Sequence, residues 1–328
     1  MLSHIKVLDL TDGLGAYTGR ILAELGADVL RAESLGHDAF LDLVAGADIL
    51  IRGRADAPLA HEALAQHNPR LIDVIVAPFH SSGHSSGESA HRPATDLTLM
   101  ARSGLMAIVG DPDRAPLKLP GEQAYALAGI QGVTAALTAL YARHASGKGQ
   151  LVAISAFQSA VLANYREPVM WQWTGRIGKR TGNLLVRGKS GVRQVWPCRN
   201  GYVTWSFVDN PGMMRALVRV MKEHGGGEAL ADIDWDKTLV ADVPREKLIE
   251  WERSVEAFFL LHSKEELSQW SVANGFGLSQ IDGVEDVLAS EQLRYRGLWR
   301  QVDDPASGRT LKVPGPLFVS SAAKENTP

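Results

Sequence analysis

Short apolar runs separated by stretches of mixed polarity make up the first half of the chain. The runs are rich in valine, isoleucine and leucine and predict buried strands, whereas the longer stretches between them predict helices. The predicted strands are residues 5–10, 27–32, 49–52, 71–76 and 151–155. The predicted helices are residues 16–25, 42–48, 60–67 and 96–107. Because strands joined through helices run in the same direction, the pattern predicts an α/β fold with a parallel sheet.

Residues 118–166 are the stretch around which the other predicted elements are arranged. Its first part is a helix on which small residues gather, namely Gly129, Gly132, Ala135, Ala136 and Ala139. These residues predict that the helix lies close to another backbone. A Gly-Lys-Gly turn at 147–149, the last predicted strand and a helix over 156–175 follow. Ligands and catalytic groups collect at such strand-to-helix corners, so Gln158 and Ser159 mark the candidate site.

A basic segment containing glycines, residues 175–183, follows this helix and predicts a crossing between two lobes. Its cations are Arg176, Lys179 and Arg180. They fit either phosphate binding or a solvated linker, and the linker is the simpler interpretation.

The remaining chain predicts a smaller lobe and a late hairpin. Residues 193–205 form a predicted hairpin with its turn at 199–201, since Asn-Gly is a strong hairpin signal. Residues 211–275 are mostly amphipathic helices. Residues 302–311 predict a second hairpin, and an extended tail follows from 313 to 321.

Composition excludes several classes of function. The chain has 328 residues, of which 45% are hydrophobic, and a formal net charge of −3, which allows one large domain or two moderate ones. Charges of both signs are scattered, so we expect no binding to nucleic acid or to a membrane surface. No uninterrupted apolar run reaches the ~18 residues of a membrane span. The N-terminus runs directly into a strand and does not resemble a signal peptide.

Cysteine and histidine often act as nucleophiles or metal ligands, but the sequence favours neither role for the cysteine or for a group of three histidines. Cys198 is the only cysteine, so an intrachain disulfide is impossible and a cytoplasmic location is favoured. Its apolar setting predicts a small buried side chain and not a nucleophile. His80, His84 and His91 lie in a Ser/Gly-rich loop, residues 80–93. They lack the spacing of metal ligands on a helix, so a solvated loop is favoured over a metal site.

A glycine-rich loop follows the first predicted strand. Gly13, Gly15 and Gly19 give the pattern G-x-G-x-x-x-G, one residue longer than the dinucleotide-binding fingerprint. Glu33 ends the second strand, where a nicotinamide-dependent enzyme holds its ribose. A single near-match is weak, so nicotinamide binding is the less favoured interpretation.

Four segments, in the correct order, resemble family III CoA-transferases, the superfamily of formyl-CoA transferase, carnitine CoA-transferase and α-methylacyl-CoA racemase. The first is VLDLTDGLGAYTGRILAELGADVLRAE, and the second joins ADILIRG to LAQHNPRLIDVIVAPF. The third and most specific is ALAGIQGVTAALTALYARHASGKGQLVAIS, and the fourth is GFGLSQIDGVEDVLASEQLRYRGLW. Together they span nearly the whole chain.

The resemblance implies both a fold and a reaction. The fold is a large Rossmann-like domain from residues 1–185 and 281–328, a small α/β domain from residues 186–280, and an interlocked dimer. The reaction is CoA transfer between carboxylic acids. In the family, an aspartate at the start of the helix after the Gly-Gln strand attacks the donor thioester, and a mixed anhydride and an enzyme-bound thioester follow. Backbone N–H groups near that carboxylate stabilise the oxyanions.

This chain departs from the family pattern at the nucleophile. Counting from the Gly-Gln pair, the aspartate position falls on Gln158, or on Ser159 with a slip of one residue. Neither is an acid, and an amide has no anionic oxygen with which to form the anhydride. Glu122 is the nearest carboxylate in sequence, and Ser159 is a weaker candidate nucleophile. Thr95 precedes Asp96 where racemase relatives place a histidine base.

The half of the family pattern that binds CoA is also reduced. Relatives carry a longer segment after the second strand, including a strand that contacts the nucleotide, whereas here Glu33 is followed closely by Asp42. The residues that remain for CoA contacts are Gly15, Ala16, Arg31, Arg52 and Arg54.

Three functions therefore stay open. The first, which we favour, is a catalytically impaired subunit of a heteromeric CoA-transferase that pairs with a full-length family member. The second is a transferase, also compatible with a homodimer, that uses Glu122 or Ser159. The third is a lyase, an isomerase or a scaffold that binds acyl-CoA. The expected ligands are CoA or acyl-CoA and a small carboxylic acid, with no metal.

Overall fold

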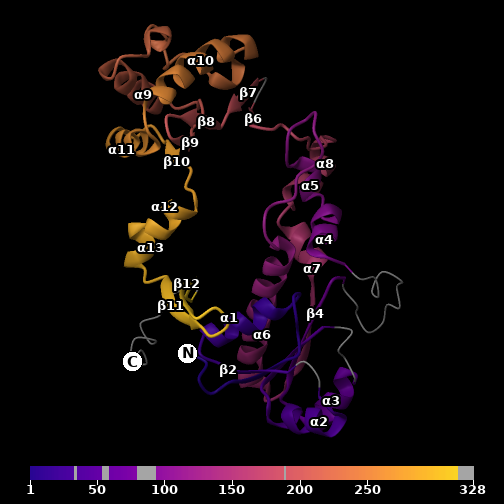
Figure 1. Cartoon of the computed structure of the whole chain (residues 1–328). Helices are drawn as coiled ribbons and strands as arrows, with labels where there is room; N and C mark the ends of the chain where they lie inside the picture. The colour runs from indigo at the N-terminus through magenta and orange to yellow at the C-terminus, as the bar shows by residue number, and fades with distance from the viewer. Residues whose placement is uncertain (33–34, 54–58, 80–93, 188–189, 317–328) are drawn as a thin grey trace. The chain divides into compact units, whose positions relative to one another are not determined.

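The computed structural model describes residues 1–32, 35–53, 59–79, 94–187 and 190–316 (Figure 1). Several residues named above lie outside these ranges, namely Glu33, Arg54, His80, His84 and His91. The last part of the predicted tail also lies outside them. The expectations for these residues stay predictions.

The chain forms two compact units, which are described separately. The first comprises Met1–Val109, Pro116–Lys179 and Gln292–Pro328, and the second comprises Gly110–Ala115 and Arg180–Glu291. The chain passes from one unit to the other inside the basic segment at 175–183. The domain boundaries at residues 185 and 280 stay predictions.

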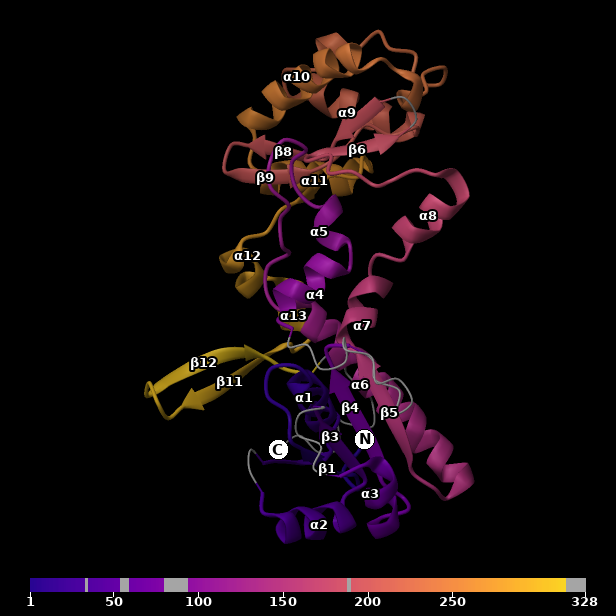
Figure 2. The same cartoon turned by 90° about the vertical axis from the view of Figure 1, so that its right-hand side faces the viewer.

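A five-stranded parallel sheet with the order β2-β1-β3-β4-β5 forms the centre of the first unit (Figure 2). Its strands are β1 (Lys6–Asp9), β2 (Asp28–Arg31), β3 (Ile49–Arg52), β4 (Ile72–Ala77) and β5 (Gln150–Ser155). All five predicted strands are thus confirmed, with ends that shift by at most one residue. Most valine, isoleucine and leucine side chains of β1, β3 and β4 are buried because helices cover both faces of the sheet. The edge strands β2 and β5 leave Leu30 and Leu151 exposed.

Helices cover the two faces of this sheet with separate hydrophobic cores. One face packs against α1 (Ala16–Glu24) and α6 (Gln123–Ser146), and the other against α2 (His37–Gly46) and α3 (His61–His67). The predicted start of α2 at residue 42 is wrong, because the helix begins directly after Gly36. Gly36 has an extended backbone there, and Asp38 in the first turn favours the helix N-terminus.

The small residues of α6 bring it against α1, as predicted. A Cβ atom added to Gly129 would lie 2.5 Å from Cβ of Tyr17, and one added to Gly132 would lie 2.6 Å from Oγ1 of Thr18. Thr18 also donates a hydrogen bond from Oγ1 to the carbonyl oxygen of Gly129 at 3.3 Å. Among the helices in the described ranges, α6 alone is long and apolar enough to cross a membrane, but its small-residue face is buried in this core.

Two predicted helices are each interrupted. The helix predicted over 96–107 divides into α4 (Asp96–Arg102) and α5 (Leu105–Ile108), because Gly104 has a φ of 85°. The helix predicted over 156–175 divides into α7 (Ala156–Leu162) and α8 (Arg166–Thr174). The breaks are coupled, since the buried Asn164 amide donates a hydrogen bond to the carbonyl oxygen of Ser103 at 3.3 Å.

The second unit combines short antiparallel strands with helices. The hairpin of β8 (Val195–Cys198) and β9 (Gly201–Thr204) confirms the predicted Asn-Gly turn, and β10 (Ser279–Gln280) joins β9. A second hairpin joins β6 (Leu184–Arg187) to β7 (Ser190–Arg193). The helices are α9 (Pro211–Glu223), α10 (Arg245–Leu261), α11 (Lys264–Asn274) and α12 (Val284–Ala289), with short 3-10 turns at Glu228–Leu230 and Val240–Asp242. Cys198 is buried in this core, as predicted.

The late hairpin is also confirmed. After α13 (Glu291–Tyr295), β11 (Trp299–Asp304) pairs antiparallel with β12 (Arg309–Pro314). Most of its side chains are exposed, including Val302 and Leu311 at 47% and 42%. A two-stranded hairpin on its own is marginal in water.

Candidate functional site

The turn that follows β5 carries Gln158, the residue that the sequence pattern assigns to the family aspartate position. Ser155 ends the strand and caps α7, and its Oγ accepts a hydrogen bond from the backbone N–H of Gln158 at 3.2 Å. Phe157 ties the same turn to the end of β4 by donating its N–H to the carbonyl oxygen of Pro78 at 2.9 Å. The corner is therefore well formed and places Gln158 at the carboxyl edge of the sheet.

The Gln158 side chain is exposed at this corner. Ser155-x-x-Gln158 has the sequence of a capping box, in which the Gln side chain would bond back to the N-cap N–H. That reciprocal bond is not formed, and no residue that the structure describes hydrogen-bonds to the carboxamide. The Gln158 carboxamide is thus exposed to solvent, and no hydrogen bond within the described ranges gives it a structural role.

Ser159 has the opposite environment. It is 1% exposed, and its Oγ lies 2.9 Å from Oε1 of Gln131 and 3.0 Å from the carbonyl oxygen of Ser155. A serine hydroxyl has a single proton to donate, and here both neighbouring groups are acceptors. No histidine or carboxylate in the described ranges hydrogen-bonds to it, so the geometry gives Ser159 the role of fixing α7 against α6.

Glu122 is exposed at the N-cap of α6 and forms no side-chain cap bond. The partner of Ser159, Gln131, lies further along the same helix by about 13 Å at 1.5 Å per residue. The structure therefore does not bring Glu122 and Ser159 together. Glu122 instead acts on Tyr125, whose pKa is raised first by burial and then by the negative charges of Glu122 and Asp96.

Asp96, at the position after the missing racemase histidine, is a buried structural acid. Its Oδ1 accepts hydrogen bonds from the N–H groups of Ala124 at 2.7 Å and Tyr125 at 3.3 Å, which open α6. Its Oδ2 lies 3.0 Å from Nζ of Lys118. The carboxylate thereby satisfies the free N–H groups of a helix terminus, and Thr95 caps α4 beside it.

The loop after β1 is shaped by a buried carboxylate. Asp9 accepts hydrogen bonds from the N–H and the Oγ1 of Thr11 at 2.9 and 2.6 Å. Burial raises the pKa of Asp9, while the bonds to Thr11 and the charge of Arg31 oppose this effect. Gly15 caps α1 with a φ of 98°, and a Cβ there would lie 2.9 Å from Cγ2 of Thr11. Glycine is required at this close turn, and Ala16 begins the helix beside it.

The two described arginines among the expected CoA contacts differ in availability. Arg31 is exposed at the end of β2 and donates one hydrogen bond, from Nη2 to the carbonyl oxygen of Thr11 at 2.9 Å. Arg52 is 1% exposed and forms a bidentate ion pair with Asp73 at 2.8 and 2.6 Å. Its Nη1 donates to the carbonyl oxygen of Leu59 at 2.8 Å. This guanidinium holds β3 to β4 and is not presented to a phosphate.

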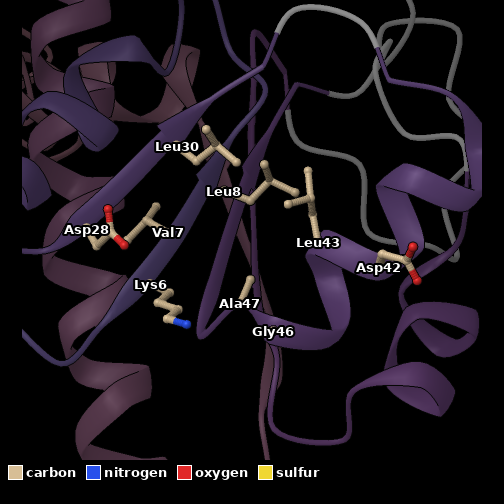
Figure 3. Close-up of a pocket in the computed structure, with 9 residues that line it drawn as sticks. All are labelled: Lys6, Val7, Leu8, Asp28, Leu30, Asp42, Leu43, Gly46 and Ala47. Carbon is tan, nitrogen blue, oxygen red and sulfur yellow. The ribbon is translucent and has the colours of Figure 1, made fainter.

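A shallow cavity of about 200 Å³ lies away from these residues (Figure 3). It is bounded by β1, β2 and α2, and Lys6 and Asp28 at the amino ends of the strands line it. No candidate site residue contributes to it. Across the described ranges, no group of three or more His, Cys, Asp or Glu side chains is arranged to hold a metal ion.

One feature of the edge was not anticipated from sequence. The guanidinium of Arg102, at the end of α4, lies over the rings of Phe79 and Phe157. Phe79 follows β4 and Phe157 directly precedes Gln158 in the chain. The sequence gives no sign of it, because three separate segments must meet to form it.

The comparisons with known proteins agree with the fold and extend over the whole chain. The profile of CoA-transferase family III matches residues 32–327. The chain is 26% identical to succinyl-CoA:(R)-benzylsuccinate CoA-transferase subunit BbsE of Thauera aromatica, covering 95% of this chain and 86% of that protein. It is 28% identical to succinate–glutarate CoA-transferase of Agrobacterium fabrum, covering 97% and 89%. Among solved structures, a CAIB/BAIF family protein from Brucella suis superposes with a TM-score of 0.76 at 22% identity, covering 97% and 92%.

The chain belongs to CoA-transferase family III. The structural likeness also confirms the mixed α/β fold with a parallel sheet that the resemblance implied.

Proposed function

We propose that this chain is a subunit of a heteromeric family III CoA-transferase and that it does not supply the carboxylate nucleophile. One observation carries the proposal. The corner after β5 is formed as a site, but it presents the Gln158 carboxamide where the family pattern has an aspartate. An amide cannot form the anhydride, so the acid comes from another chain.

The names of the relatives support a subunit of this kind. Thauera BbsE is named as a subunit of a succinyl-CoA-dependent transferase, and the Agrobacterium relative as a succinate–glutarate CoA-transferase. By analogy, the substrates proposed here are an acyl-CoA and a small carboxylic acid. Gly15, Ala16 and Arg31 are retained as CoA contacts, together with Arg54, whereas Arg52 is assigned to the fold because Asp73 occupies it.

In the assembled enzyme, the partner's carboxylate attacks the thioester carbonyl of the acyl-CoA. This attack expels the CoA thiolate and forms a mixed anhydride between the enzyme and the first acid. The thiolate then attacks the anhydride at the enzyme acyl group, releases the first acid and leaves an enzyme-bound thioester. The carboxylate of the second acid then attacks the enzyme-bound thioester, which gives a second mixed anhydride and free CoA thiolate. The thiolate attacks this anhydride at the acyl carbon of the second acid, which releases the new acyl-CoA and restores the enzyme carboxylate. Backbone N–H groups near the partner's carboxylate stabilise each oxyanion.

Use of another residue in this chain has less support. Ser159 is buried between acceptors without a base, and Glu122 lies on the order of 13 Å along α6 from the Gln131 that holds Ser159. A lyase, an isomerase or a scaffold for acyl-CoA would tolerate Gln158, but no feature of the corner favours one of them.

Exposed apolar side chains support a tightly associated partner, including the interlocked arrangement that the family implies. The short helix α8 buries none of its residues, and Trp171 and Trp173 are 57% and 84% exposed. Large exposed apolar side chains gathered on one short helix are typical of a segment that is covered in an assembly. We place the complex in the cytoplasm, in agreement with a single cysteine that has no disulfide.

Co-expression tests the proposal. This chain, carrying the only affinity tag, is expressed with a full-length family relative that keeps the aspartate. We expect the two chains to co-purify, and light scattering to give the mass of a heteromer.

Replacement of both Trp171 and Trp173 by serine should reduce the recovery of the partner. Tyr141→Ser, at an equally exposed aromatic on α6, serves as the matched control. A tagged chain that stays monomeric in the presence of the relative would refute the subunit assignment.

A further inference from the structure

Arg102 is an exposed cation held by aromatic rings instead of an acid. Its Cζ lies 4.9 Å from the ring centroid of Phe79 and 5.6 Å from that of Phe157, and these two rings are 5.7 Å apart. A guanidinium over the face of an aromatic ring is stabilised by a cation–π interaction. No ion pair or side-chain hydrogen bond joins Arg102 to any residue in the described ranges.

The location of this cluster is that of a ligand site. Phe79 follows β4 and Phe157 follows β5, two strands that are neighbours in the sheet. α4 and α7 pack together, and they lie side by side in both views (Figures 1 and 2). Ligands of open α/β sheets bind outside the carboxyl ends of such strands. Phe157 is also the residue before Gln158, with Cα atoms about 3.8 Å apart.

The charges at this edge leave Arg102 without a described counter-ion. Asp96 is engaged by the first N–H groups of α6 and by Lys118, and Asp9 is engaged by Thr11. Gln158, which takes the place of the family aspartate, is neutral. Within the described ranges, no acceptor occupies the N–H donors of this guanidinium.

We propose that Arg102 and Gln158 form a binding site for the free carboxylate of a small organic acid. A planar guanidinium matches a carboxylate with two parallel N–H···O bonds, and the rings beneath it restrict its motion. The Gln158 carboxamide offers a further N–H donor to the same anion. This inference rests on the proposed function, because the ligand is of the class that receives or releases CoA. In this subunit the corner binds the acid and does not react with it.

Titration calorimetry with succinate on the purified full-length chain tests the site. We expect the native chain to bind succinate and Arg102→Gln to bind it at least tenfold more weakly, because a charge-assisted bidentate contact is lost. Arg102→Lys should fall between the two, since lysine keeps the charge but not the planar fork. Phe157→Leu should weaken binding severalfold, because it removes one ring and keeps an apolar side chain.

Arg20→Gln is the matched control. Arg20 is also an exposed arginine over a ring, 5.6 Å from the centroid of Tyr17, but it is paired with Glu24 at 3.1 Å. Succinate affinity should therefore be unchanged in this variant. Thermal unfolding of each variant shows whether it is folded. Succinate affinities are compared only among variants with native-like unfolding transitions, so that a loss of stability is not mistaken for a loss of binding.

Three results would overturn the proposal: no succinate binding by the native chain, equal affinity in Arg102→Gln, or tighter binding of inorganic phosphate than of succinate. The last result would assign the cation to a phosphate group. Because the readout is binding to this chain alone, it is separate from the proposed function. A chain that binds succinate but never pairs with a relative would refute the subunit assignment and keep this site.

Discussion

Gln158 and Ser159 are adjacent, yet the structure gives them opposite environments. Gln158 is exposed without a described partner, and Ser159 is sealed between α6 and α7. Sequence counting alone leaves both as alternatives for the family aspartate position. The helix geometry separates them, because only the first points a polar side chain to solvent. The chemistry of the corner is therefore set by an amide.

The buried ion pair between Arg52 and Asp73 leads to a prediction about stability. Arg52→Met should lower the free energy of unfolding by about 3–5 kcal/mol, because it removes the bidentate partner of the buried Asp73 carboxylate and, in the described ranges, leaves only His61, 3.2 Å away, beside it. The double variant Arg52→Met with Asp73→Leu should recover most of this loss, since neither charge then remains. Urea denaturation measures both. Equal losses in the single and double variants would show that the pair itself is not the cause.

His262 leads to a prediction about pH. Its Nε2 is buried without a hydrogen-bond partner in the described ranges, and burial lowers its pKa below the usual 6.5. The charge of Glu266 opposes this shift, and the charges of His224 and Arg199 add to it. Below pH 6.5, His262 binds a proton in the unfolded chain but stays neutral in the folded chain until the pH reaches its lowered pKa. The contribution of His262 to the free energy of unfolding is therefore greatest above pH 6.5. It decreases as the pH falls toward the pKa that His262 has in the folded state.

His262→Phe removes this proton linkage and keeps the packing against Phe258 and Trp270. The free energy of unfolding of the variant relative to the native chain should therefore rise as the pH falls below 6.5. Urea denaturation across this range measures the difference. His144→Phe, at an exposed position on α6, is the control. A difference that stays constant with pH would argue against the linkage.

At the scale of elements, the turn into β5 depends on one glycine. A Cβ on Gly149 would lie 2.0 Å from the carbonyl oxygen of Leu71, and the Gly149 N–H donates to the carbonyl oxygen of Pro69 at 2.9 Å. Gly149→Ala should therefore lower the free energy of unfolding by about 3 kcal/mol, at the upper end of the usual range for overpacking.

Gly46→Ala is the matched control for this change. Gly46 ends α2, and a Cβ there meets nothing within 4 Å. Alanine should leave stability unchanged or raise it by up to about 1 kcal/mol, since it favours the helix. Denaturation midpoints of the two variants decide the matter, and indistinguishable midpoints would contradict the close approach of the strands.

At the scale of the whole molecule, the sequence predicts the parallel sheet and two of the three hairpins in the described ranges, because each depends on local patterns of apolar and turn residues. It does not predict the hairpin of β6 and β7. It misses the breaks at Gly104 and Asn164, which stabilise each other through the bond from Asn164 to Ser103. It also places Arg52 among the CoA contacts, since the pairing with Asp73 depends on strand register. Tertiary contacts of this kind have no local signal.

The candidate site divides in the same way. The loss of the acid at Gln158 can be predicted from the family pattern alone. The cluster of Arg102, Phe79 and Phe157 cannot, because α4 and the ends of β4 and β5 meet only in the folded chain. The reaction therefore has to be tested at the level of the assembly.

The most direct measurement is isotope exchange between short-chain acyl-CoA donors, with succinyl-CoA first, and their labelled free acids. The exchange is followed for the purified chain alone and for its complex with a relative that keeps the aspartate. We predict no exchange above background for the chain alone, because Gln158 cannot form the anhydride, and steady exchange for the complex. Sustained exchange by the chain alone would contradict the account.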